Sequence, residues 1–224
     1  DKLGGECLNY GCIPSKTMIN TSDMYHKMPD LSTQGIEFES VTVDLETFQT
    51  WKNSITKKLR GGIDLLCKNY GVEVVFGTAK IRNPNLVEVT SGENKKEIST
   101  EYIIIATGSR AKDLEDLRFD GNQIISAKDV LDLDKVPKSM LIVGGGAIGL
   151  ELGTALAKFG TRVTIIEITD KLLPGIEQDL VNVVERSADK IGIKVLLNSR
   201  ITEISKESEV VVSIKNNDNV SNEK

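Results

Sequence analysis

The sequence predicts an α/β fold organised around a dinucleotide-binding unit, and three features of its second half support that prediction. A short, continuous apolar run, MLIV at residues 140–143, has the composition of a strand buried in a parallel sheet. A glycine-rich turn follows it, and a helix-length stretch then leads to a second apolar run that ends in an acid. The 224 residues are 39% hydrophobic and 27% charged, the composition of an ordinary globular protein.

The first half of the chain is expected to contain two helices and several short strands. Proline favours the first position of a helix, so a helix is expected to begin near Pro14 and to end near Met28. A second helix is expected over residues 45–70, with a kink or close packing at the Gly61-Gly62 pair. Short apolar runs predict strands at 72–76, 86–90 and 102–106.

The second half is expected to alternate strands and helices and to end in short strands. The elements expected after the strand at 140–143 are a helix to about 159, a strand at 162–167, a helix at 176–190, and strands at 193–197, 201–204 and 210–214. The tail at 216–224 is polar and rich in asparagine, so it is expected to be frayed.

A charged stretch at residues 110–120 separates the two halves. It has no hydrophobic periodicity, and we interpret it as a linker. The sequence therefore predicts one domain over 1–119 and a second over 120–224.

The glycine-rich turn after the strand at 140–143 fits the pattern GxGxxG at Gly144, Gly146 and Gly149, with Ala147 and Ile148 inside it. Gly144 permits a tight turn, Gly146 lets the backbone approach a pyrophosphate, and Gly149 lets the helix close on the sheet. The unpaired N–H groups of the helix N-terminus would face the phosphates. The alternative is a glycine-rich turn in an unrelated α/β domain.

Glu167 ends the second strand of this unit, eighteen residues after Gly149. That is close to the spacing of the carboxylate that binds the ribose in dinucleotide sites. A carboxylate accepts a hydrogen bond from a 2′-hydroxyl but repels a 2′-phosphate, at a cost of about 4 kcal/mol per charge pair. No arginine follows at residues 168–170 to receive a phosphate. NAD is therefore favoured over NADP; the alternative is an exposed glutamate at a strand end.

Cys7 and Cys12 lie five residues apart and predict redox chemistry. A bridge between them would close a small loop and stabilise the fold by only about 2 kcal/mol, so a purely structural role is a poor explanation. Cys12 comes at the start of the helix that Pro14 begins, where the helix dipole favours a thiolate, and Lys16 adds a positive charge one turn later. A short disulfide with one stabilised thiolate suits two-electron exchange with a dithiol.

A zinc site is the other interpretation of these cysteines, with Cys67 and His26 as further ligands. The four residues between Cys7 and Cys12 are the wrong spacing for a structural zinc knuckle, so no metal is expected.

Overall composition excludes several classes of function. Acids outnumber bases 33 to 28, which gives a net charge of −5 and leaves no basic stripe for nucleic acid. No apolar run approaches the length of about 18 residues that a membrane span requires. Three cysteines are too few for a secreted disulfide scaffold, so an intracellular location is expected, in the cytoplasm or the mitochondrial matrix.

These motifs together resemble those of the flavin-dependent pyridine nucleotide–disulfide oxidoreductases. GGECLNYGCIPSK at residues 4–16 is similar to the redox-disulfide signature of that family, and Leu8 with the IPSK ending leans towards its lipoamide branch. The supporting matches cover most of the chain and are SDMYH at 22–26, GGI at 61–63, IIIATGS at 103–109, VP at 136–137 and GGGAIGLELG at 144–153.

The resemblance implies FAD and NAD as cofactors and assigns roles to single residues. It implies that Cys7 is the thiol that meets the dithiol substrate, that Cys12 faces the flavin, and that Lys16 beside the flavin pairs with Glu151 where nicotinamide stacks. Ile201 resembles a backbone contact to the adenine of NAD. The residues that resemble FAD contacts are Gly4, Gly5, Glu6, Ala79, Thr107, Gly108 and Ser109. The family more often has threonine where this chain has Glu6.

The same resemblance implies two Rossmann-like domains, the first (FAD) incomplete at its N-terminus, and no C-terminal interface domain. We therefore expect an internal part of a longer homodimeric enzyme, which alone would hold FAD weakly and not turn over. The implied reaction is oxidation of dihydrolipoamide with NAD, in a 2-oxo acid dehydrogenase or glycine cleavage complex. The implied partner is the lipoyl domain of a 2-oxo acid dehydrogenase complex, which carries the lipoamide. The alternatives are a mercuric or glutathione-type reductase, and a non-catalytic NAD-binding redox sensor.

Overall fold

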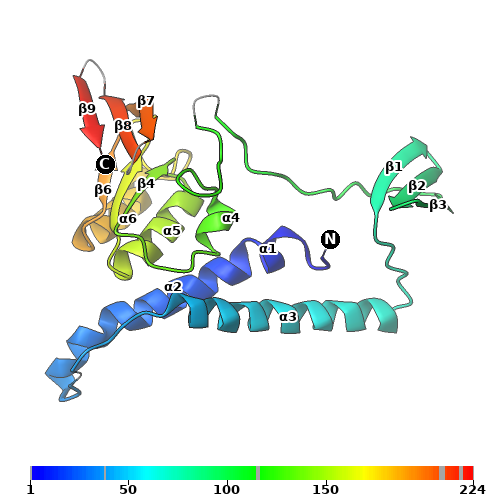
Figure 1. The fold of residues 1–224 in the computed structure, drawn as a ribbon, viewed down its shortest axis with the longest axis horizontal. Helices are drawn as coiled ribbons and strands as arrows, with labels where there is room; N and C mark the ends of the chain where they lie inside the picture. Colours follow the sequence, from blue (N-terminus) through cyan, green and yellow to red (C-terminus); the bar gives the residue numbers. More distant parts are fainter. Residues whose placement is uncertain (1, 38, 115–116, 207–209, 217–218, 224) are drawn as a thin grey trace.

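The computed structural model describes residues 2–37, 39–114, 117–206, 210–216 and 219–223. It is a mixed α/β structure with one parallel and two antiparallel three-stranded sheets. Figure 1 shows the parallel sheet, its helices and the last strands gathered together, with the first antiparallel sheet standing apart near the far end of the longest helix. The expected α/β class is confirmed.

The helices of the first half are α1 (Gly5–Asn9), α2 (Cys12–Lys27), the 3-10 helix η1 (Met28–Gln34) and α3 (Leu45–Asn69). Both predicted helices are confirmed; α2 begins two residues before Pro14, so that Cys12 lies in its first turn. The Asp44 carboxylate caps α3 by accepting a hydrogen bond from Thr47 N–H at 3.1 Å. The expected kink or close packing at Gly61-Gly62 is wrong, because α3 is continuous and an added Cβ there would meet no described atom within 4 Å.

The first antiparallel sheet consists of β1 (Thr78–Asn83), β2 (Leu86–Ser91) and β3 (Asn94–Ser99). The predicted strand at 86–90 is confirmed as β2. Its two neighbours were missed because their apolar signals are weak: β3 has one apolar residue, Ile98, and β1 has only Ala79 and Ile81 between polar residues and is exposed along its whole length. The turn glycine Gly92, at φ +60°, was the available signal for a hairpin at this point.

The predicted strands at 72–76 and 102–106 are wrong. Both segments are irregular, and Val72 is 55% and Ile104 91% exposed. A strand needs a neighbour to pair its backbone groups, and within the described residues neither run pairs with another strand. The run at 102–106 is apolar throughout and that at 72–76 is apolar except for Glu73, a composition typical of strands buried on both faces of a sheet. Between these runs and the second half, residues 110–114 and 117–120 form the irregular connection that was expected as a linker.

The second half begins with α4 (Ala127–Val130) and follows its predicted order closely. Its parallel sheet, in the order given, is β4 (Ser139–Val143), β5 (Arg162–Ile166) and β6 (Lys194–Leu196), with α5 (Ala147–Lys158) and α6 (Gln178–Lys190) as connections. The antiparallel meander after it is β7 (Ser199–Lys206), β8 (Val210–Asn216) and β9 (Asn219–Glu223). Over residues 219–223 the prediction of a frayed tail is wrong, because β9 pairs with β8 despite its polar sequence; residues 217–218 and 224 of that tail lie outside the described part of the chain.

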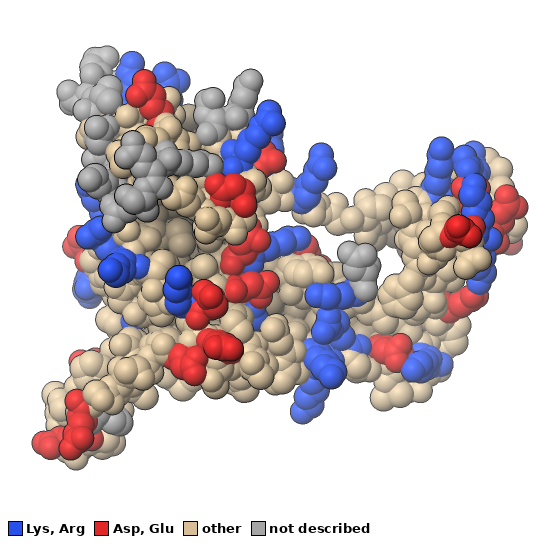
Figure 2. Space-filling model, viewed as in Figure 1, with Lys and Arg blue, Asp and Glu red and all other residues tan. Residues whose placement is uncertain are grey.

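The main hydrophobic core joins α2 and the start of α3 to the parallel sheet. Met18 and Leu45 are 2% exposed and belong to the same buried cluster as Leu156 and Ile165, which are fully buried. Figure 2 shows acidic and basic side chains interspersed on the surface in that view. Among the described helices, none is long and apolar enough to cross a bilayer.

A buried lysine ties α3 to the segment after α4. The Lys52 side chain is 3% exposed; its Nζ donates to Leu131 O at 2.5 Å and lies 2.7 Å from Asp132 Oδ1. Asp132 is 71% exposed, so water can solvate its carboxylate when the lysine is removed.

We predict that Lys52→Met lowers the free energy of unfolding by about 1–3 kcal/mol, because the buried Leu131 carbonyl loses its charged donor. Urea unfolding followed by circular dichroism measures this. Lys68→Met is the matched control, since the Lys68–Asp64 pair lies on the surface of the same helix, and a much smaller change is expected there. Equal losses in the two variants would contradict the prediction.

Candidate active site

A disulfide joins α1 to α2 at one end of the site. It links Cys7 in α1 to Cys12, the first residue of α2, with 4.5 Å between the two Cα atoms. The first-turn N–H groups of the sixteen-residue α2 therefore lie next to Cys12, which favours a thiolate there when the bond is open. Cys67 is a separate free thiol on α3. No group of three potential metal ligands occurs among the described residues.

The loop that carries the disulfide is held by both local and distant residues. Asn9 Nδ2 donates to Leu3 O and Gly5 O, each at 2.9 Å. The Tyr10 ring makes cation–π contacts with two ammonium groups, Lys2 Nζ at 5.0 Å and Lys128 Nζ at 4.7 Å from its centroid. Lys128 also pairs with the Glu6 carboxylate at 3.0 Å, so α4 contacts both flanks of Cys7.

An ion pair connects the disulfide helix to the helix that follows the glycine-rich turn. Lys16, one turn after Cys12, places Nζ 2.7 Å from both oxygens of Glu151 in α5. These side chains are 57% and 38% exposed, so a ligand can reach them. The two residues that the sequence assigned to one site are thus brought together from positions 135 residues apart.

The glycine-rich turn has the backbone geometry that its sequence predicts. Gly144 adopts φ +108°, which favours glycine, and a Cβ at Gly149 would lie 2.2 Å from Gly144 O. At Gly146, by contrast, an added Cβ would meet no described atom within 4 Å. Gly149 therefore closes α5 against the strand, while the backbone at Gly146 borders open space. Ala147 and Ile148 form the first turn of α5, with Ile148 65% exposed.

Glu167 lies directly after β5, and its carboxylate hydrogen-bonds to the backbone of the glycine-rich turn. It is 6% exposed; Oε2 accepts a hydrogen bond from Gly145 N–H at 2.7 Å, and Oε1 accepts from Thr169 N–H and Oγ1 at 2.9 Å. Burial raises the pKa of Glu167, but the hydrogen bonds from Thr169 and Gly145 outweigh it and lower the pKa below its ordinary value. The sequence missed this organising role because it depends on a contact across 22 residues.

We predict that Glu167→Gln destabilises the fold by about 1–3 kcal/mol at pH 7, because an amide nitrogen would face donors that now meet a carboxylate. Because the folded-state pKa is lowered, the carboxylate stabilises the fold at neutral pH, and that contribution is lost as pH falls below about 5. The stability of Glu167→Gln should therefore change less with pH than that of the wild type. Urea midpoints at several pH values measure this, with the exposed Glu101→Gln as control. An unchanged pH profile in Glu167→Gln would refute it.

The other predicted site residues are not gathered around the disulfide. Ala79 lies in β1, and Thr107, Gly108 and Ser109 lie in the exposed, irregular segment that leads from that sheet. Figure 1 shows this sheet well separated from α1, where Gly4 and Gly5 adopt positive φ angles beside the disulfide. Ile201 lies in β7, packed against the small cluster of Ile166, Val212 and Ile214.

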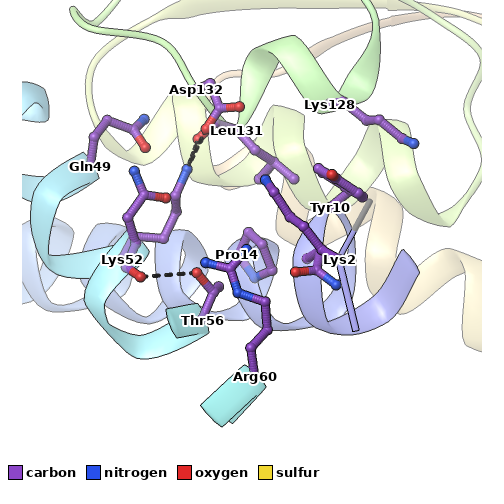
Figure 3. Close-up of a pocket in the computed structure, with 12 residues that line it drawn as sticks. Lys2, Tyr10, Pro14, Gln49, Lys52, Thr56, Arg60, Lys128, Leu131 and Asp132 are labelled. Atoms are coloured by element: carbon purple, nitrogen blue, oxygen red, sulfur yellow. Dashed lines mark hydrogen bonds and ion pairs between the residues drawn. The ribbon is translucent and has the colours of Figure 1, made fainter. Parts of the chain in front are cut away.

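A pocket of about 450 Å³ beside the disulfide loop was missed by sequence reasoning. Figure 3 shows its lining residues converging from the disulfide loop, α3 and α4. Asn9 Oδ1 and Gln49 Oε1 are buried acceptors without a hydrogen-bond partner in the described part of the chain, and both residues line this pocket. Its cationic residues are Lys2, Lys52, Arg60 and Lys128. The available signal was Lys52, a charged residue one turn after Phe48 on the buried face of α3.

Comparison with known proteins gives a family match over almost the whole chain. The family described as pyridine nucleotide-disulphide oxidoreductase matches residues 2–223. Dihydrolipoyl dehydrogenase 2 of Haloarcula marismortui is 42% identical over 196 residues, covering 86% of this chain and 41% of the relative. Dihydrolipoyl dehydrogenase of Geobacillus stearothermophilus is 42% identical over 197 residues, covering 88% of this chain and 42% of the relative.

Solved structures agree on the fold. LpdA of Mycobacterium tuberculosis superposes with a TM-score of 0.87 at 22% identity, over 99% of this chain and 49% of LpdA. The HOCl-induced flavoprotein disulfide reductase RclA of Escherichia coli superposes with a TM-score of 0.76 at 25% identity, over 98% of this chain and 46% of RclA. The chain thus spans less than half the length of the relatives it matches here.

Proposed function

Because the chain belongs to the pyridine nucleotide-disulphide oxidoreductases, we propose that its protein oxidises dihydrolipoamide with NAD through the Cys7–Cys12 disulfide and FAD. One observation supports this reaction above all: the Lys16–Glu151 pair links the helix that begins with Cys12 to the helix that begins at the glycine-rich turn. A dithiol-reactive centre and a nucleotide site thereby share one ion pair.

The residues around the disulfide fit FAD. Basic side chains suit its diphosphate, and the unpartnered Asn9 and Gln49 oxygens suit its hydroxyl donors. The positive φ angles of Gly4 and Gly5 allow the backbone to approach a bulky ligand. We propose Glu6 and Lys16 as further contacts beside the disulfide, and Ala79, Thr107, Gly108 and Ser109, which lie away from it, as contacts elsewhere on the same ligand. These residues belong to a proposed FAD domain over 1–119, followed by an NAD domain over 120–224.

The cysteines exchange two electrons with the substrate. One thiolate of dihydrolipoamide attacks Cys7 Sγ, the disulfide breaks, and Cys12 leaves as a thiolate stabilised by the α2 N-terminus and Lys16. The second substrate thiolate then displaces Cys7, so that lipoamide leaves as a disulfide and both cysteines are reduced. FAD, when bound, supplies the redox group that relays this electron pair to NAD as hydride. The cysteines return to the disulfide.

The nucleotide site favours NAD. The glycine-rich turn opens on the N-terminus of the twelve-residue α5, which suits a pyrophosphate. A buried Glu167 carboxylate with lowered pKa keeps negative charge behind the turn, which disfavours a 2′-phosphate. We propose Glu151 beside the nicotinamide and the Ile201 backbone near the adenine.

The relatives reported above are named dihydrolipoyl dehydrogenases, which supports a dihydrolipoyl group as the substrate. By analogy with them we propose that lipoamide arrives on the lipoyl domain of a 2-oxo acid dehydrogenase complex. We further propose a homodimer located inside the cell, in the cytoplasm or the mitochondrial matrix.

A comparison of substrates in parallel assays tests the proposed function. The protein encoded by the complete reading frame that contains this chain is assayed for NADH formation from dihydrolipoamide and NAD. Parallel assays follow NADPH oxidation with oxidised glutathione or with mercuric ion. Rapid NADH formation is expected. Activity only with NADPH would contradict the substrate and nucleotide assignments, and NAD binding without any turnover would instead favour a redox sensor.

A further inference from the structure

Two ion pairs, not one, connect α2 and α5. In addition to Lys16–Glu151, Lys158 Nζ lies 2.5 Å from Asp23 Oδ1. Each second partner comes seven residues after the first on its own helix, so the helices run parallel. Apolar contacts accompany the charges: Met18 of α2 and Leu152 of α5 belong to one buried cluster, and the Tyr25 and Phe159 rings lie 6.1 Å apart.

The two pairs have opposite polarity. Along α2 the cation Lys16 precedes the anion Asp23, whereas along α5 the anion Glu151 precedes the cation Lys158. Sliding one helix by seven residues would bring Lys16 towards Lys158, or Asp23 towards Glu151, and like charges repel. Sliding by one turn would separate both pairs. Together the four charges therefore favour a single axial register of α2 on α5.

The second pair is the better shielded of the two. Asp23 and Lys158 are 35% and 19% exposed, against 57% and 38% for Lys16 and Glu151. Less water around a pair means less screening, so Asp23–Lys158 contributes more to the register. The first pair stays accessible to a ligand.

We propose that Asp23 and Lys158 are positioning residues: by setting the axial register of α2 on α5, they set the position of the disulfide relative to the nucleotide site. Asp23 lies eleven residues after Cys12, about 16 Å along the helix, so it acts only through the rigid helix. Lys158 is likewise at the opposite end of α5 from the glycine-rich turn. The Asp23–Lys158 pair holds the C-terminal parts of α2 and α5 together. Because both helices are rigid, it also fixes the positions of Cys12 and Lys16 relative to Glu151. The inference deepens the proposed function and rests on it.

Charge reversal tests the pair. Asp23→Lys, Lys158→Asp and the double reversal are made in the protein from the complete reading frame, loaded with FAD. The rate at which NADH reduces the Cys7–Cys12 disulfide is measured by rapid quenching and thiol alkylation, far below the unfolding temperature. Each single reversal is expected to slow reduction about 10-fold or more, with KM for NADH little changed, and the double reversal is expected to restore the rate to within about threefold.

Two further measurements separate the possible outcomes. Urea unfolding of the same variants gives a double-mutant cycle. The stability lost by the double reversal should be smaller than the sum of the losses in the two single reversals. The matched control reverses Arg82 and Glu88, an ion pair on β1 and β2, and should leave the reduction rate unchanged.

Single reversals that reduce the disulfide at the wild-type rate would overturn the positioning role, as would a double reversal that regains stability but not rate. Because NADH drives this assay, it remains informative when dihydrolipoamide is not the substrate. A wild-type protein that is reduced by NADH but does not oxidise dihydrolipoamide would contradict the proposed function alone.

Discussion

Replacing either Cys7 or Cys12 by serine should lower kcat/KM for NAD reduction by dihydrolipoamide at least about a thousandfold. The electron pair of the substrate enters the protein by opening the bond between these two sulfur atoms, and a serine hydroxyl cannot form that bond. The disulfide closes only a small loop, so its loss should cost about 2 kcal/mol of stability and leave the fold intact.

Cys67→Ser is the matched control for this loss of activity. Cys67 is a free thiol on α3, apart from the disulfide, and its replacement should leave turnover unchanged. Steady-state assays compare turnover in the three variants, and circular dichroism confirms that each is folded. Substantial activity in a folded Cys7→Ser or Cys12→Ser variant would mean that the electrons take another route.

Alanine at two glycines of the same turn should differ in its effect on stability but have the same effect on NAD binding. Gly149→Ala forces a Cβ to within 2.2 Å of Gly144 O, so it should destabilise the fold by about 1–3 kcal/mol. Gly146→Ala has open space and an allowed φ of −79°, so stability should be retained or slightly raised. Both should weaken NAD binding about 10-fold or more, Gly149→Ala by distorting the turn and Gly146→Ala by filling the space of the pyrophosphate.

Isothermal titration with NAD and urea unfolding of both variants separate these effects. Gly153→Ala is a useful reference, since the nearest atoms to its Cβ would be side-chain atoms away from the turn, of Ile142 at 2.9 Å, Val163 at 3.4 Å and Ile165 at 3.6 Å. It should lose stability without a specific loss of NAD affinity. Unchanged NAD affinity in Gly146→Ala would contradict the placement of the pyrophosphate at this turn.

The parts of the fold that local patterns determine were predicted well from the sequence. The β4–α5–β5 unit follows from a buried apolar run, three glycines and a terminal acid, all close together in the chain. The start of α2 follows from Pro14, and the extent of α3 follows from its apolar periodicity, although the kink expected at Gly61-Gly62 is absent. The disulfide and the Lys16–Glu151 pair were found because their motifs are specific, although Glu151 is far from Lys16 in sequence.

What failed depended on neighbours that no local pattern reveals. Residues 102–106 are as apolar as β4 but have no strand to pair with in the described chain, whereas the polar β9 pairs with β8. The burial of Lys52 and the Asp23–Lys158 pair each need two segments that meet only in the folded chain. Charged residues of this kind look like solvated helix faces until their partners are known.

The most direct test of the account asks whether electrons pass through the Cys7–Cys12 disulfide. The FAD-loaded protein is mixed under anaerobic conditions with one equivalent of dihydrolipoamide and no NAD, quenched with an alkylating agent and examined by peptide mass spectrometry. We predict that Cys7 and Cys12 become alkylated, that Cys67 gives the same signal with and without substrate, and that adding NAD restores the disulfide while NADH forms. NADH formation while the Cys7–Cys12 disulfide stays intact would contradict the central claim.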